Sequence, residues 1–378
     1  MSILIVDDSL LNMKFFQDIL QEAGYSNIHT ASSAQDAYIK LGMDADGKEI
    51  GRPITSFDLV LLDVVMPEMD GIEACRRIKS CSRYRDLPII FVTANKNHLQ
   101  DAFDAGGMDF IQKGFERVEL LARVKSAITL KKEMDSRKDR EAKMTKELQL
   151  AKTIQRSVLS PPIVDQHIEI HGAYIQSDEV SGDMFYWTPI DEHRYGIMLI
   201  DVSGHGLSSS LISMSIRSLL GGLVNRGTEP EQIFYELNRQ MLQLFGGGKK
   251  FVYLTAIYLV IDIQRKHIKY FNAGHPPGLL IQQGEVAARL ESACVPIGVK
   301  RTPNVKTAYI PYETGNRLVI YTDGLVETKG TAISAGIHQL ELDAVRFHSL
   351  NNQEFIDRVV SLRDNKADDV CLISILLK

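Results

Sequence analysis

The sequence predicts two domains of different classes: an α/β domain with a doubly wound five-stranded parallel sheet, and an α+β domain with two packed, mainly antiparallel sheets flanked by helices. At 378 residues the chain is longer than one hydrophobic core usually serves. Apolar strand-like runs alternate five times with helical patterns in the first third, which is typical of a doubly wound sheet. The strand patterns of the last half are longer and follow one another in pairs, as in antiparallel sheets.

The bulk composition excludes several classes of protein. Hydrophobic residues make up 44% and charged residues 24%, which are ordinary globular values, and the net charge of −5 gives no basic surface for nucleic acid. The apolar stretch 254–261 is too short to span a bilayer, and the N-terminus begins with a strand pattern rather than a signal peptide. Four cysteines without CxxC spacing suit a reducing cytosol. We expect a soluble, cytoplasmic protein with no nucleic-acid or membrane partner.

Residues 1–130 form the first predicted domain. Its first strand begins at Ser2 as a continuous apolar run, the pattern of a parallel strand buried on both faces. A helical pattern follows and stops at Gly24. After a second short strand and its helix, the remaining strands are predicted at 59–63, 88–93 and 108–113.

Polar residues gather where these strands end, namely Asp7, Asp8, Asp63, Thr93 and Lys113. The carboxyl ends of parallel strands share one edge of the sheet, so these side chains should converge. Two or three carboxylates can hold one Mg²⁺, and Asp63 can then attack a phosphoryl group whose charge the ion and Lys113 neutralise. A single aspartate there is usually a solvated turn residue, whereas five polar residues together indicate a site.

These residues resemble the site of a two-component receiver domain. The most specific match is the run Asp63-Val-Val-Met-Pro-Glu-Met-Asp-Gly71. The resemblance implies that a histidine kinase phosphorylates Asp63 and that one Mg²⁺ binds beside it. The implied functional residues are the acidic pair Asp7 and Asp8, the phosphoacceptor Asp63, the switch residues Thr93 and Phe110, the site lysine Lys113, and the Mg²⁺ ligands Asp8, Asp63 and the backbone carbonyl of Val65.

Two features depart from the receiver pattern. Gly114 follows Lys113 where the family usually has a proline in a cis peptide, so we expect a looser loop. The segment 42–56 is longer than usual before the third strand. We interpret it as a solvated insertion, because its acidic residues lack the spacing of a Ca²⁺-binding loop.

Residues 131–160 are predicted to form a helical linker. Between Lys131 and Glu147 twelve of seventeen residues are charged, with both signs interleaved and no Gly or Pro, the pattern of a solvent-exposed helix. Apolar residues then recur at a spacing of three and four up to Pro161. Two interpretations stay open: a spacer helix packed on its own domain, and a two-stranded coiled coil that continues the preceding helix and makes a homodimer.

Residues 161–378 form the second predicted domain, with carboxylates again placed at strand ends. Strand patterns lie at 195–201, 253–262, 266–272 and 317–323, and helical patterns lie at 207–224 and 230–245. The strand-end carboxylates are Asp183, Asp201, Asp323 and the pair Asp368 and Asp369. Four carboxylates on a rigid frame are enough for a two-metal centre, in which water between the ions attacks phosphorus in line. The sequence contains no Ser-His-Asp order and no reactive-cysteine pattern.

An Asp-Gly pair by itself is more often an ordinary turn than part of a site. A lone histidine in a turn is likewise more often structural than catalytic. His205 and His275 lie in Gly/Pro turns and are interpreted as structural, with the segment 272–277 shaping the site.

Taken in order, these motifs resemble the metal-dependent protein phosphatase (PPM) family in its SpoIIE/RsbU-like bacterial branch, over residues 145–378. The segment 150–161 also resembles the helix that introduces such phosphatases. The resemblance implies two Mn²⁺ or Mg²⁺ ions. In the implied roles Asp183 orients metal-bound water, Asp201 bridges the ions, the Val202 carbonyl contributes to one ion, and Asp323 and Asp368, with Asp369 as the neighbouring candidate, complete the other. Cys371 stands where the family usually has Thr or Ser, and we expect altered packing there.

The expected function is that of a response regulator in which phosphorylation of Asp63 controls a phosphoserine/phosphothreonine protein phosphatase. The family branch implies a phosphorylated anti-sigma-factor antagonist as substrate, within a partner-switching pathway. The alternative is a phosphorylation-gated binding adaptor with a catalytically dead phosphatase fold, but such relatives lose the carboxylates first, and all four positions are filled here. A DNA-binding regulator is disfavoured because the sequence has no helix-turn-helix pattern.

Overall fold

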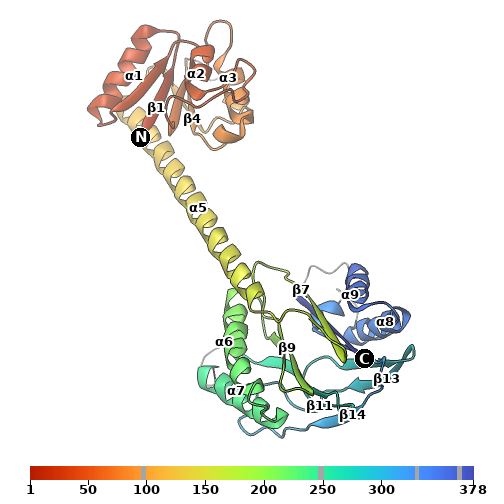
Figure 1. Ribbon diagram of the computed structural model, residues 1–378. Coiled ribbons are helices and arrows are strands. Elements are labelled where there is room, and N and C mark those ends of the chain that lie inside the picture. The colour runs from red at the N-terminus through yellow and green to blue at the C-terminus, as the bar shows by residue number, and fades with distance from the viewer. Residues whose placement is uncertain (95–98, 246–250, 328–331, 364–367) are drawn as a thin grey trace. The chain divides into compact units, whose positions relative to one another are not determined.

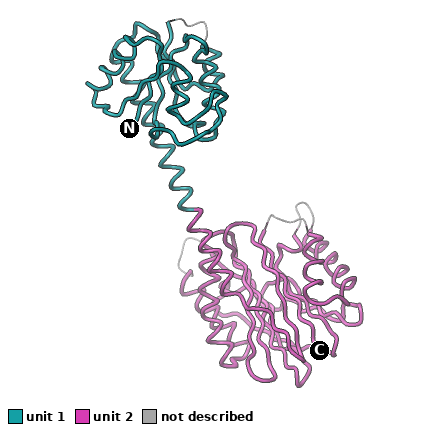
Figure 2. The backbone as a smooth tube through the Cα atoms, turned by 45° about the horizontal axis from the view of Figure 1, so that its top comes forward, with its two compact units in different colours: residues 1–144 teal, residues 145–378 magenta. Residues whose placement is uncertain are grey.

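The chain folds into two compact units, Met1–Met144 and Thr145–Lys378, in a computed structural model (Figures 1 and 2). The structure describes residues 1–94, 99–245, 251–327, 332–363 and 368–378. The boundary between the units falls inside the predicted linker 131–160.

The first unit is a doubly wound parallel sheet, as predicted. Its strand order is β2-β1-β3-β4-β5, and every pairing is parallel. Side chains alternate between two cores, one on each face: Leu4 and Val6 pack into one, Ile3 and Ile5 into the other. The strands are β1 (Ser2–Val6), β2 (Asn27–Ala31), β3 (Leu59–Asp63), β4 (Ile89–Thr93) and β5 (Asp109–Gln112), and the helices covering them are α1 (Leu10–Glu22), α2 (Ala34–Leu41), α3 (Gly71–Ser80), α4 (Leu99–Asp104) and the start of α5 (Arg117–Ser157).

Local caps begin the helices directly after the strand-end loops. Ser9 accepts a hydrogen bond from the backbone N–H of Asn12 at the start of α1, and Asp70 accepts one from Glu73 at the start of α3. At Gly71 the backbone lies so close to β3 that a Cβ atom would stand 1.9 Å from the carbonyl oxygen of Asp63. The glycine that ends the Asp63–Gly71 run is therefore needed to hold α3 against the site.

The insertion 42–56 is tied to the first unit. Met43 and Glu49 form an isolated antiparallel bridge, and the Met43 side chain is buried. Arg83 pairs with the Glu49 carboxylate at 3.0 Å and donates a hydrogen bond to the backbone oxygen of Gly51. The segment is largely exposed, in keeping with the expected solvated insertion, but it has a defined conformation.

Helix α5 continues from the last helix of the sheet domain into the second unit. It runs from Arg117 to Ser157, so the predicted linker helix and the preceding helix are one element. The charged stretch is exposed and carries i,i+4 pairs such as Arg137 with Glu141, which support a solvated helix.

The second unit is a sandwich of two antiparallel sheets between two pairs of helices, which confirms the predicted α+β class. One sheet has the order β14-β11-β10-β9-β8, and the other has the order β13-β12-β15-β16-β7-β6. A shared core joins the two sheets, with Ile197 and Ile257 from one and Ile320 and Ile373 from the other. The strands are β6 (Ile163–Val164), β7 (Ile168–Ile175), β8 (Met184–Pro189), β9 (Arg194–Val202), β10 (Leu254–Asp262), β11 (His267–Ala273), β12 (Gly278–Gln282), β13 (Glu285–Leu290), β14 (Ala308–Pro311), β15 (Arg317–Tyr321) and β16 (Val370–Leu377).

Each outer face of the sandwich has its own helices and its own core. Helices α6 (Leu207–Val224) and α7 (Pro230–Phe245) have the predicted bounds and cover the first sheet. Helices α8 (Ile333–Arg346) and α9 (Asn352–Ser361) cover the second. The sequence patterns did not predict α8, α9, β7 or the strands from β12 to β14.

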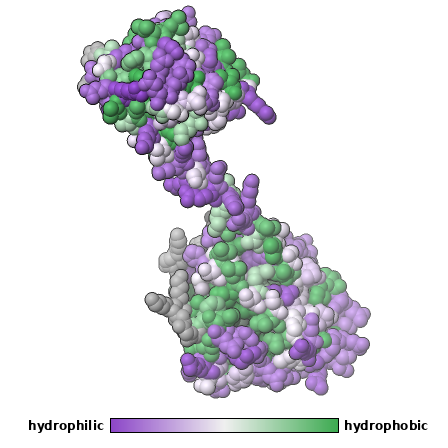
Figure 3. All heavy atoms as spheres, turned by 90° about the vertical axis from the view of Figure 1, so that its left-hand side faces the viewer, coloured by the Kyte–Doolittle hydropathy of each residue, from purple (hydrophilic) through white to green (hydrophobic). Residues whose placement is uncertain are grey.

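Within the described residues, α6 alone has the length and apolar composition of a membrane-spanning helix, with 33% of that stretch buried. It packs on the sheet through Ile216, Leu220 and Val224, as the core helix of a globular domain does. Figure 3 shows apolar side chains gathered on one face of the second unit. Leu211 of α6 and Leu244 of α7 are exposed.

Candidate functional site

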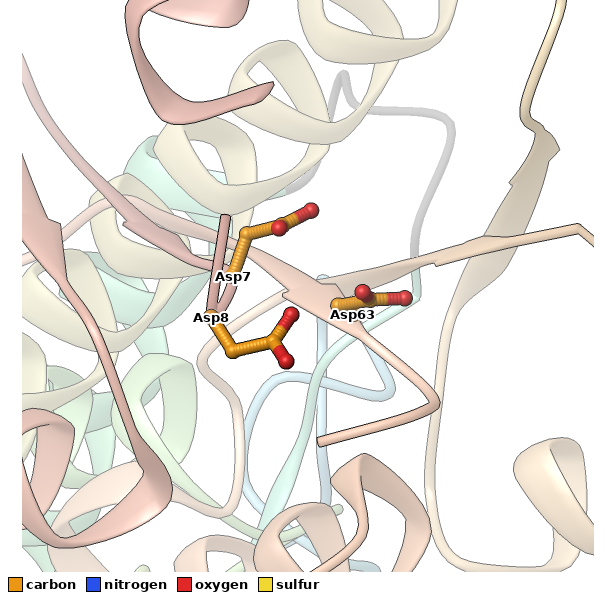
Figure 4. A group of neighbouring side chains, drawn as sticks. All are labelled: Asp7, Asp8 and Asp63. Carbon is orange, nitrogen blue, oxygen red and sulfur yellow. The ribbon is translucent and has the colours of Figure 1, made fainter. Parts of the chain in front are cut away.

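Three carboxylates meet at the carboxyl ends of β1 and β3 in the first unit. Asp7 and Asp8 follow β1, and Asp63 is the last residue of β3. One oxygen from each lies within 4.8 Å of the others, and Figure 4 shows Asp8 extending toward Asp63. Asp7 and Asp63 are buried whereas Asp8 is exposed. The adjacent parallel strands therefore bring together the acidic residues expected from the sequence, in a set suited to one Mg²⁺.

Lys113 joins this cluster from the end of β5. Its Nζ lies 2.7 Å from Asp63 Oδ2 and 3.4 Å from Asp7 Oδ2. Burial raises the pKa of Asp63, while the hydrogen bond and charge of Lys113 oppose this rise. Burial lowers the pKa of Lys113, but the hydrogen bond and charge of Asp63 outweigh it, and the pKa is raised. The 2.7 Å contact places a cation beside the carboxylate, an arrangement that suits a phosphoacceptor.

The remaining predicted residues of the first unit lie on or beside β3, β4 and β5. Thr93 is buried at the end of β4, and its carbonyl oxygen accepts a 2.7 Å hydrogen bond from the Lys113 backbone. Phe110 is half-buried on β5, and its ring centroid lies 6.2 Å from that of Phe103 in an edge-to-face arrangement. Val65 is exposed beside Asp63.

Gly114 departs from the family pattern in its backbone as well. Its φ of +96° lies in the left-handed region, which a proline cannot adopt. The turn after Lys113 therefore needs the residue that this chain has.

The second unit gathers its strand-end aspartates around one pocket of about 240 Å³. Asp183 precedes β8, Asp201 lies near the end of β9, and Asp323 begins a 3₁₀ turn after β15. Asp368 and Asp369 precede β16. Because both sheets contribute, residues 186 positions apart in the sequence face the same space. His205 and Thr255 also line this pocket.

These carboxylates raise one another's pKa. Burial and then the charge of Asp201 raise the pKa of Asp183 well above its usual range. Burial, followed by the charges of Asp323 and Asp368, raises the pKa of Asp201 to about 7. Asp183 Oδ2 is buried without a hydrogen-bond partner in the described part of the chain. Crowded carboxylates with a free buried oxygen fit divalent cations, which would supply the missing positive charge.

The two adjacent aspartates before β16 have different surroundings. Asp369 Oδ1 accepts hydrogen bonds from the backbone N–H and hydroxyl of Ser177 at 2.8 and 2.9 Å, and Oδ2 accepts one from Gly182 at 3.3 Å. The carboxylate of Asp368 contributes directly to the raised pKa of Asp201 and Asp323. This arrangement favours Asp368 over Asp369 as the residue with oxygens available to a cation.

Gln155, near the end of α5, is a functional candidate that sequence reasoning missed. Its side chain is buried, donates a 2.6 Å hydrogen bond to the Ser181 carbonyl, and accepts one of 3.1 Å from the Ser181 N–H. The Gln155 side-chain amide thus hydrogen-bonds both backbone groups of Ser181, which lies two positions before Asp183. The signal available in the sequence was a polar residue inside the apolar stripe of 144–158.

Divalent cations should stabilise the second unit, because they relieve the repulsion among its buried aspartates. At an Mn²⁺ concentration a hundred times the Kd, we expect about 2.7 kcal/mol of added stability. For a unit of this size that corresponds to a rise of roughly 5–10 °C in Tm. Differential scanning calorimetry with Mn²⁺ and with EDTA measures the shift. An equal shift in the Asp183→Asn variant would contradict its origin in this pocket.

The first unit has a receiver-type acidic site on a doubly wound sheet. The second has an aspartate pocket on a sandwich of two antiparallel sheets. Together they define a receiver joined to a PPM-type phosphatase domain. Family models agree: residues 3–125 match the response regulator receiver domain, and residues 191–378 match stage II sporulation protein E (SpoIIE). The chain therefore combines a response regulator receiver domain with a SpoIIE-type PPM phosphatase domain.

Two curated relatives each match less than half of the chain. Over 175 residues the chain is 40% identical to phosphoserine phosphatase RsbP of Bacillus subtilis, covering 46% of this chain and 43% of that protein. Over 127 residues it is 35% identical to transcriptional regulatory protein YvrH of the same organism, covering 33% and 48%. The chain thus spans less than half the length of either protein. The SiaA-PP2C domain of Pseudomonas aeruginosa shares the phosphatase fold, with a TM-score of 0.54 at 19% identity over 63% of this chain and 98% of that one.

Proposed function

We propose that the chain is a response regulator in which phosphorylation of Asp63 controls a metal-dependent phosphoserine/phosphothreonine protein phosphatase. A histidine kinase supplies the phosphoryl group. The substrate is a phosphorylated anti-sigma-factor antagonist, and the protein works in the cytoplasm as part of a partner switch. The 40% identity to phosphoserine phosphatase RsbP over 175 residues supports the reaction and the substrate class.

The observation that carries the proposal is the pocket where aspartates from both sheets of the sandwich meet. A binding adaptor would have no need to bury carboxylates that raise one another's pKa, since each one lowers the stability of the fold without a cation. Their retention supports an enzyme that uses cations.

The pocket residues would have different roles in hydrolysis. Asp201, Asp323, Asp368 and the Val202 carbonyl would hold two Mn²⁺ or Mg²⁺ ions. When bound, these ions polarise the phosphate and activate water for in-line attack. Asp183 is buried at the pocket wall and orients the attacking water, while Asp369 fixes the Gly182 backbone that leads to Asp183. The pocket opens beside exposed His205, which leaves room for a phosphorylated side chain.

Helix α5 would couple phosphorylation of the receiver to the phosphatase unit. It contains the end of the receiver and the start of the phosphatase unit in one element, and Gln155 binds the loop that leads to Asp183. We infer that phosphorylation of Asp63 draws in Thr93 and Phe110, while Asp7, Asp8 and the Val65 carbonyl would hold a Mg²⁺ that neutralises the phosphoryl charge. The change alters the pairing of α5 in a homodimer and so moves the Ser181 loop.

The direct test is hydrolysis by the full chain with Mn²⁺, before and after loading Asp63 with phosphoramidate or acetyl phosphate. The substrates are p-nitrophenyl phosphate, a phosphoserine peptide, a phosphotyrosine peptide and phosphorylated anti-sigma-factor antagonists. We expect activity on the aryl phosphate and the phosphoserine substrates, and little on phosphotyrosine. Hydrolysis of none of them would favour the adaptor.

A further inference from the structure

An apolar groove lies between α6 and α7, next to the aspartate pocket. It has a volume of about 470 Å³, which is within the range of sites that hold ligands. Leu211 of α6 and Leu244 of α7 both line it, although they are 60% and 62% exposed. Single exposed leucines are ordinary, whereas two that line one hollow from different helices form a patch typical of a binding surface. The apolar groove is formed mainly by Leu211, Ile212, Leu219, Met241, Leu244 and Val252.

The apolar groove and the aspartate pocket share a rim. Tyr253 lines the pocket, and its neighbour Val252 lines the groove. His205 lines the pocket, and Ser208, three residues further along the chain, lines the groove. Two hydrogen bonds hold these segments side by side: the Ser203 backbone donates to the Tyr253 carbonyl at 3.0 Å, and the Tyr253 backbone donates to Ser203 Oγ at 3.1 Å. A chain that leaves the pocket over this rim therefore enters the groove.

Glycines keep the rim low. Gly204 and Gly206 flank His205 in the loop between β9 and α6, with φ angles of +90° and +85° that favour glycine. A Cβ atom on either residue would meet no heavy atom within 4 Å, so both border open space. The His205 side chain between them is 79% exposed. The loop thus leaves room for a bound chain to cross from the pocket to the groove.

The length of the groove sets the size of what it binds. Ser208 and Leu219 are the first and last residues of α6 that line it, and their separation corresponds to about 16 Å of helix. An extended chain covers that length with about five residues. A stable dimer interface uses about 20–30 residues a side, whereas eleven residues line this groove. The groove therefore fits a short apolar segment better than a second copy of this chain.

We propose that the apolar groove binds an apolar segment of the phosphoprotein substrate while the phosphoserine occupies the aspartate pocket. Because the two sites share a rim, the segment lies within about five residues of the phosphoserine. The phosphate is the same in every phosphoserine protein, so the groove supplies a discrimination between substrates that the aspartates cannot. The inference rests on the proposed phosphatase function and deepens it by naming a feature of the substrate.

Hydrolysis of paired phosphoserine peptides by the full chain with Mn²⁺ tests the groove. One peptide of each pair carries leucines within about five positions of the phosphoserine, before it in one pair and after it in the other, and its partner carries asparagines there. In at least one pair the leucine peptide should have a KM about tenfold lower than the asparagine peptide, with a similar kcat. Equal KM values within both pairs would overturn the proposal.

The variants Leu211→Asn and Leu244→Asn test whether this preference originates in the groove. Both side chains are exposed, so the variants should fold. Each should remove most of the preference for the leucine peptide and leave turnover of p-nitrophenyl phosphate unchanged, because that small substrate does not reach the groove. Leu342→Asn is the matched control, since Leu342 is exposed on α8, which covers the other sheet. A full preference in both groove variants would contradict the proposal.

Two further measurements separate the alternatives. Sedimentation of the groove variants should match that of the wild type. Loss of a dimer in these variants, with an unchanged peptide preference, would assign the groove to contact between two copies and overturn the proposal. Fluorescence polarisation with labelled peptides that carry serine in place of phosphoserine measures binding without turnover, and the leucine peptide should bind about tenfold more tightly. Equal binding of the two peptides would also overturn the proposal. If the wild type hydrolyses no phosphomonoester, the proposed phosphatase function fails, while polarisation still decides whether the groove binds an apolar segment.

Discussion

The Asp201→Asn variant should lose at least about a thousandfold in phosphatase rate while remaining folded. Asp201 lies among Asp183, Asp323 and Asp368. Burial, followed by the charges of its neighbours, raises its pKa to about 7. The amide removes the negative charge that a pair of cations needs. The same change also removes a source of repulsion, so without metal the variant should unfold at a higher temperature than the wild type.

Two measurements separate these effects: turnover of p-nitrophenyl phosphate with Mn²⁺, and Tm in EDTA. Asp357→Asn is the matched control, because Asp357 is exposed on α9. Turnover by Asp201→Asn close to that of the control would refute the assignment of this pocket as the catalytic centre. A lower Tm in EDTA would show instead that the Asp201 carboxylate contributes to folding.

The second large effect is expected at Asp63→Asn, which should take up no phosphoryl group from acetyl phosphate. The reason is chemical: an amide oxygen is a poor nucleophile, whereas the Asp63 carboxylate lies 2.7 Å from a lysine that would neutralise the incoming phosphoryl oxygens. Asp7 and Asp8 stay in place, so the domain should stay folded. Phosphatase activity of this variant should be the same with and without the phosphodonor.

Phosphate-affinity electrophoresis and phosphatase rates check this expectation. Asp18→Asn is the control, because Asp18 is an exposed carboxylate on α1 paired with Lys14. A variant at Asp63 whose phosphatase rate still responds to acetyl phosphate would break the proposed link between the two units.

The receiver site could be predicted almost completely from the sequence. Each of its strands is a short apolar run that ends in a polar residue, and parallel strands in one sheet place their carboxyl ends together. Local patterns therefore imply the meeting of Asp7, Asp8, Asp63 and Lys113, which the structure confirms.

The phosphatase pocket was harder to predict from the sequence, because antiparallel strands can pair in many orders. The sequence suggested the aspartates, but the choice between Asp368 and Asp369 depends on the hydrogen bonds from Ser177 and Gly182. The strand β7 also went unpredicted, although it pairs with β16 along its whole length. Its apolar–polar alternation covers only Ile168 to His171 and is followed by Gly172, so the strand pattern is short.

The amino-acid order by itself determined the two fold classes, the helix that joins them and the carboxylates available to each site, because these follow from periodicity over a few residues. Only the tertiary structure decided which polar partners surround those carboxylates. Gln155 reaches the Ser181 backbone across 26 positions, and His275 reaches Thr255 across 20. Such contacts depend on how distant elements pack, and a buried polar group takes the partner that packing places beside it.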